Sequence, residues 1–174
     1  MRIDGEILRF FKNENLYDEK TFKYIDSQCE YVDYYDDLQN FHIGYGPRNN
    51  NPMHILEGIS LCIPYPVDAF TKIYDVHEIT HAIVACRYLN RRYKEGITVE
   101  ALPFLYEKLF IIQSNNKKYE LCGEYLDSLY DENSDVYKFA FFARPYLLEA
   151  YDKNIDHMEQ LSKKLVKKYN KTIK

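Results

Sequence analysis

The sequence predicts an α+β fold, mostly helical, in which a small sheet precedes one central helix. Three observations predict it. The chain has 174 residues, 46% of them apolar, which suffices for the core of one domain spanning residues 1–174. Apolar and polar residues alternate over Ile59–Ile63, as in a strand with one buried face. The segment from Ile73 to Ala85 is apolar on nearly every side, as in a buried helix.

The first forty residues are expected to be helical, because apolar residues recur there every three to four positions. The recurring residues are Phe22, Ile25, Cys29, Val32 and Tyr35, and an apolar group precedes them at Ile7, Leu8, Phe10 and Phe11. A segment rich in Gly, Pro and Asn, residues 44–52, predicts a loop. Extended segments are expected on either side of it, at Phe41–Tyr45 and Gly58–Ile63, and Pro64 closes the second.

Asp68 is the expected N-cap of the central helix, which should run to about Tyr88 or Asn90. A turn around Glu95 and Gly96 follows. Apolar periodicity then predicts four further helices. They cover Val99–Ile112, Lys118–Tyr130, Asp135–Tyr151 and Ile155–Tyr169.

Composition and charge limit the possible partners and location. The net charge is -4, and lysines cluster only near the C-terminus, where they alternate with apolar residues as on the solvated face of a helix. We therefore expect no nucleic-acid partner. No apolar run approaches a membrane span or a signal peptide, so we expect no membrane partner. The four cysteines are widely spaced, which is typical of reduced thiols and predicts a cytoplasmic protein.

The segment His77-Glu78-Ile79-Thr80-His81 predicts a zinc site. On a helix, residues four apart share a face, so both imidazoles point to one place. Two imidazoles are half of a zinc coordination shell, and Glu78, one residue on, can act as general base without ligating the metal. Two histidines and a glutamate in an apolar helix are costly unless they have a partner, which a metal ion supplies.

A catalytic zinc site needs a third protein ligand. The candidates are Glu100 and Glu107, which are seven residues apart and share a face of a regular helix. Glu100 is favoured because it begins the next helix, close to the turn at Gly96. Glu107 is the alternative if Pro103 delays the start of that helix, and otherwise it would support a ligating histidine.

A resemblance to the gluzincin metallopeptidases rests on the segment His77-Glu78-Ile79-Thr80-His81-Ala82, with Glu100 downstream. The sequence of this segment is also similar to that of the active helix of thermolysin. The pair Glu100 and Glu107 also resembles the oligopeptidase F and thimet oligopeptidase family. These resemblances imply a compact zincin-like domain that hydrolyses peptide bonds. The second family has Gly where this chain has Thr80, and its spacing to the glutamate is longer.

The resemblance to the oligopeptidase F family also implies an oxyanion donor, Tyr137, although an aromatic residue that merely packs is the alternative. His157 is a second candidate donor, but its surroundings are more typical of a surface histidine. Arg144 is expected in a structural ion pair rather than on a substrate carboxylate. His42 and His54 have no partner at a ligand spacing.

The sequence therefore predicts a zinc-dependent peptidase that acts on a peptide or protein, with the strand Gly58–Ile63 as the edge to which an extended substrate adds. Two alternatives stay open. One is a regulatory or binding protein that keeps the zinc with little peptidase activity, and the other is a peptidase that cleaves a single transcriptional repressor. Oligomeric state is not predicted.

Overall fold

The computed structural model describes residues 2–32, 45–47, 59–64, 68–87, 96–130 and 132–173. The chain divides into two compact units, Met1–Tyr93 and Lys94–Lys174. The prediction that residues 1–174 form one domain stays a prediction, because compact units of this size can belong to a single domain.

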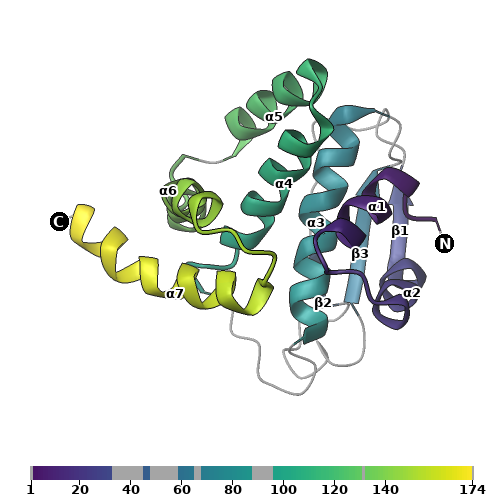
Figure 1. Cartoon of the computed structure of the whole chain (residues 1–174), viewed down its shortest axis with the longest axis horizontal. Helices are drawn as coiled ribbons and strands as arrows, with labels where there is room; N and C mark the ends of the chain where they lie inside the picture. Colours follow the sequence, from purple (N-terminus) through teal and green to yellow (C-terminus); the bar gives the residue numbers. More distant parts are fainter. Residues whose placement is uncertain are drawn as a thin grey trace. The chain divides into compact units, whose positions relative to one another are not determined.

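The first unit contains three helices and three short strands in its described part (Figure 1). In chain order these are α1 (Gly5–Asn13), α2 (Glu19–Gln28), β1 (Cys29–Val32), β2 (Tyr45–Pro47), β3 (Ile59–Pro64) and α3 (Ala69–Arg87). Helices α2 and α3 both contact β3, and α1 contacts α3. Lys72 on α3 forms an ion pair with Glu6 on α1, with its ammonium group 2.8 Å from the Glu6 carboxylate.

Strand β3 lies in the centre of the sheet, whose order is β1-β3-β2. β1 pairs with it in parallel, Cys29 opposite Leu61, and β2 pairs antiparallel, Tyr45 opposite Leu61. The prediction that this strand is a free edge for a substrate is therefore wrong: both of its sides carry a neighbour. A peptide that extended the sheet would have to pair with β1 or β2 instead.

Helix α3 is buried on almost all sides, as the sequence predicts for residues 73–85. Asp68 caps it, since its carboxylate accepts a hydrogen bond from the Thr71 amide at 2.9 Å. The Thr71 hydroxyl in turn lies 3.2 Å from the Asp68 amide, which satisfies a second donor of the first turn. The cap fixes where the helix begins, and with it the positions of the histidines two turns later.

In its described part, the second unit is built of helices. They are α4 (Ala101–Ser114), α5 (Lys117–Leu129), α6 (Asp135–Glu149) and α7 (Ile155–Thr172). Helix α4 contacts each of the other three. Pro103 lies in the first turn of α4, where a missing amide hydrogen costs no intrahelical bond, so the helix runs on without a break.

The predicted α+β fold class is wrong, and the described fold is helical. Its helices are up to 19 residues long, whereas its strands have four, three and six residues. Two of the strands end at a proline, which cannot donate to a ladder, so the extended segments stay short.

Local expectations also need correction. Cys29 and Val32, assigned to a helix by their spacing, lie in β1, and Tyr45–Pro47, assigned to a loop, form β2. The four later helices occur where the sequence predicts them, with ends that move by up to three residues. The expected turn at Glu95 and most of the extended segment at Phe41–Tyr45 lie outside the described residues.

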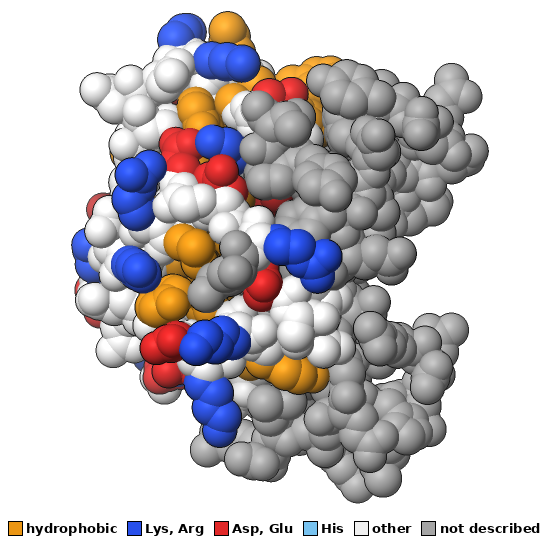
Figure 2. Space-filling view, turned by 90° about the vertical axis from the view of Figure 1, so that its right-hand side faces the viewer, with side chains coloured by type: hydrophobic (Ala, Val, Ile, Leu, Met, Phe, Trp, Pro, Cys, Tyr) orange, Lys and Arg blue, Asp and Glu red, His pale blue; other side chains and the backbone are white. Residues whose placement is uncertain are grey.

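Among the described helices, none is both long enough and apolar enough to cross a membrane. Figure 2 shows one face of the molecule, on which the described Lys and Arg side chains are interspersed with Asp and Glu. On that face the described charges do not gather into a patch of one sign.

Candidate metal centre

His77 and His81 lie one helical turn apart on α3, and their rings meet edge to face with centroids 4.9 Å apart. Their Nε2 atoms are 3.2 Å apart, and the side chains are 4% and 8% exposed. Two zinc ligands at ~2.0–2.1 Å in tetrahedral geometry have their nitrogens about 3.3–3.4 Å apart. The pair is therefore spaced, within about 0.2 Å, as two ligands of a single zinc ion.

Glu78 is also buried, at 4% exposure, and lies one residue from His77 on the same helix. A step of one residue turns the helix by about 100°, so Glu78 leaves α3 in a different direction from the imidazoles. Glu78 is not a member of the group of potential metal ligands found among the described residues. The neighbouring Thr80 hydroxyl donates to the Val76 carbonyl at 2.7 Å, which satisfies it inside the helix.

Asp75 adds a second carboxyl group to this buried helix, and the sequence reading did not single it out. It is 1% exposed, and its Oδ1 has no hydrogen-bond partner among the described residues. Burial, and then the charge of Glu78, raises the pKa of Asp75 to about 9. In the metal-free protein Asp75 is therefore a neutral acid at pH 7. The sequence signal for it was a carboxylate in an apolar helix, three residues before Glu78.

Asp75→Asn is expected to stabilise the metal-free protein at neutral pH, by an amount on the order of a few kcal/mol. Between the ordinary aspartate pKa and about 9, the unfolded chain has lost the Asp75 proton and the folded chain still holds it, so the native protein loses stability as pH rises through this window. The variant removes that slope. Urea unfolding at several pH values in the presence of a chelator measures it, with the exposed Asp156→Asn as control; equal slopes in wild type and Asp75→Asn would contradict the prediction.

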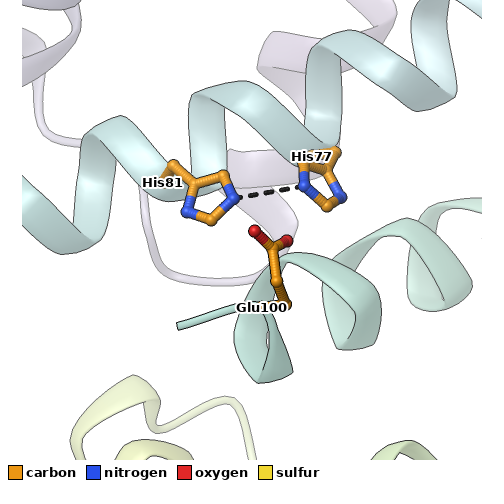
Figure 3. Close-up of side chains that lie close together, drawn as sticks. All are labelled: His77, His81 and Glu100. Atoms are coloured by element: carbon orange, nitrogen blue, oxygen red, sulfur yellow. Dashed lines mark hydrogen bonds between the residues drawn. The ribbon is translucent and has the colours of Figure 1, made fainter. Parts of the chain in front are cut away.

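Glu100 joins the two histidines in the single group of potential metal ligands found among the described residues (Figure 3). The ligand atoms of His77, His81 and Glu100 lie within 4.8 Å of one another, and the group could hold a metal ion. Glu100 occupies the N-cap position of α4 without capping it through its side chain. Two imidazoles and one carboxylate are a donor set that zinc accepts in catalytic sites.

Glu107, the alternative ligand, is held within the second unit. It is 2% exposed and accepts a hydrogen bond from the Tyr130 hydroxyl at 2.8 Å. Arg144 forms a bidentate pair with Asp127, at 2.9 and 2.8 Å, which is the structural ion pair expected for it. The sequence reading missed Tyr130, because a tyrosine at a helix end gives no signal until its hydroxyl is placed.

Tyr137, the predicted oxyanion donor, lies on α6 in an aromatic cluster. Its ring stacks on Phe104 with centroids 5.9 Å apart and lies 4.9 Å from the ring of Tyr130. These contacts fit the packing alternative, and the catalytic role stays a prediction. His157 pairs with Asp152 at 2.6 Å on the surface, as expected of a surface histidine, while His42 and His54 lie outside the described residues.

Comparison of the chain with protein-family models, with curated proteins and with solved structures found no match.

Proposed function

We propose that this protein is a zinc-dependent peptidase in which His77, His81 and Glu100 would hold the metal and Glu78 is the general base. The observation that carries the proposal is the separation of 3.2 Å between the buried Nε2 atoms of His77 and His81. Without a metal the two rings can share one N–H···N hydrogen bond at this distance, and the same spacing allows both nitrogens to bind a single cation.

The donor types favour zinc as the metal. Nitrogen and carboxylate ligands in a set of three, with a position left for substrate or water, are typical of catalytic zinc, whereas a closed set of four is typical of structural zinc. Among the described residues, the metal-binding group contains three members and no cysteine. A bound zinc ion would supply Lewis-acid activation of water and of a carbonyl group.

Glu78 is the residue on which the proposed hydrolysis depends. A carboxylate beside the ligands, but not among them, can take the proton of the attacking water and then deliver it to the leaving amine. Glu78 is buried, so bulk water has little access to its carboxylate. The resemblance of residues 77–82 to the gluzincin active helix supports a peptide bond as the substrate.

Metal analysis and hydrolysis of unstructured protein substrates test the proposal together. Purified protein should contain about one zinc per chain and should cleave such a substrate. A strong chelator should remove both the zinc and the activity, and added zinc should restore both. Protein without zinc that gains neither metal nor activity on zinc addition would overturn the proposal.

A further inference from the structure

Helix α5 presents apolar side chains on two opposite sides. Its inner side, formed by Tyr119, Gly123 and Leu126, is buried, and α5 contacts α4. A Cβ atom on Gly123 would lie 2.4 Å from the Ile111 side chain, so the two helices approach closely at this point. The close approach fixes α5 on α4 and thereby fixes which side of α5 faces outward.

The outer side of α5 carries a stripe of large apolar residues at four-residue spacing. Leu121, Tyr125 and Leu129 are 54%, 57% and 56% exposed. Ile112, at 56%, lies near the end of α4, shortly before the turn into α5. These four are all but one of the exposed large hydrophobic residues in the described part of the chain, the other being Ile173. Apolar surface gathered in this way is typical of an interaction site.

The charges at the two ends of α5 indicate what covers the stripe. Exposed Lys118 lies in the first turn of the helix, and exposed Glu132 follows its end. Lys117 is paired with Glu120 of the same turn at 2.9 Å. Lys118 and Glu132 both oppose the macrodipole of α5, which favours acidic residues at the start and basic ones at the end. An antiparallel copy of the same helix brings Lys118 of each copy beside Glu132 of the other.

The apolar residues of the outer face are also arranged symmetrically for an antiparallel pair of helices. In an antiparallel pair centred on Tyr125, each Leu121 lies opposite Leu129 of the other copy, and Tyr125 lies opposite itself. Such self-complementarity is what a two-fold interface requires.

We propose that the outer face of α5 (Leu121, Tyr125 and Leu129) is a dimerisation surface on which a second copy of this chain docks antiparallel. A face of three residues is smaller than the ~800 Å² per partner of a standard interface, so a weak dimer is expected. The proposal is independent of the zinc site.

Sedimentation velocity over micromolar to near-millimolar protein concentrations tests it. The wild-type chain should shift from monomer to dimer as concentration rises. Tyr125→Glu should weaken the dimer at least about tenfold, because it places two carboxylates together at the centre of an apolar interface. Ile173→Glu, the same class of change at an exposed site off this face, is the matched control and should dimerise as the wild type does.

Charge reversal keeps the test decisive if Tyr125→Glu does not fold, as circular dichroism would show. Lys118→Glu should weaken the dimer, and adding Glu132→Lys should restore it. A chain that stays monomeric at every concentration, or a dimer that survives both Tyr125→Glu and Lys118→Glu, overturns the proposal. Zinc content should be equal in all of these variants, which separates this result from that of the peptidase proposal.

Discussion

Glu78→Gln is expected to reduce peptide hydrolysis by about 10²–10⁴-fold while zinc stays bound at one ion per chain, since a positioned general base contributes a factor of this size. Glutamine has almost the shape of glutamate but cannot accept the proton of the attacking water. His77 and His81 keep their spacing in this variant, because the change is isosteric within α3. Activity on an unstructured protein substrate and metal analysis of the same sample measure the two effects.

Glu149→Gln is the matched control, because Glu149 is exposed at the end of α6, and it should retain both activity and zinc. Loss of zinc from Glu78→Gln would mean that Glu78 is a ligand rather than the base. A variant that keeps zinc, loses no cellular function and lacks hydrolysis would favour the regulatory alternative.

The part of the site that sequence could predict is the part contained in one helix. His77, Glu78 and His81 are related by the helical repeat alone, and the N-cap at Asp68 and the apolar run from Ile73 both marked that helix. Burial of the histidines followed from the same apolar run. No information about distant residues was needed for any of these predictions.

The predictions that failed depended on pairing partners that lie far away in the sequence. Cys29 and Val32 have helical spacing, yet they pair with Leu61 and Pro64 in a parallel ladder. The segment Ile59–Ile63 was correctly assigned as extended, but alternation says nothing about the number of neighbours, and both sides of β3 are occupied. The contribution of the sheet to the fold class was also overestimated. The length of a strand depends on its pairing partners and on prolines that end it, and alternation in the sequence does not reveal the partners.

The choice between Glu100 and Glu107 as third ligand also depends on contacts with residues that are distant in the sequence. Helical spacing places both on one face of α4, and only the contacts of each carboxylate distinguish them. The Glu107 carboxylate accepts a hydrogen bond from the hydroxyl of Tyr130, which lies 23 positions later in the sequence. No local sequence pattern predicts that bond.

Glu100→Gln and Glu107→Gln should therefore differ sharply. Glu100→Gln is expected to weaken zinc binding more than about 100-fold, beyond the 10–100-fold typical of residues that only support a ligand, and to abolish hydrolysis with it. Glu107→Gln should leave zinc affinity within a few-fold of the wild type. Its effect should be on folding, with a loss of about 1–3 kcal/mol, because a buried hydrogen bond to a charged acceptor is replaced by a neutral one.

Competition with a chromophoric chelator measures the zinc affinities, and urea unfolding of metal-free protein measures the stabilities. The two substitutions make the same chemical change on the same helix, so each serves as the control for the other. If Glu107→Gln lost the zinc and Glu100→Gln kept it, Glu107 would be the third ligand. Equal losses from both would instead indicate that Glu107 supports the metal through a ligand, and the Tyr130 bond would then be the means of orienting its carboxylate.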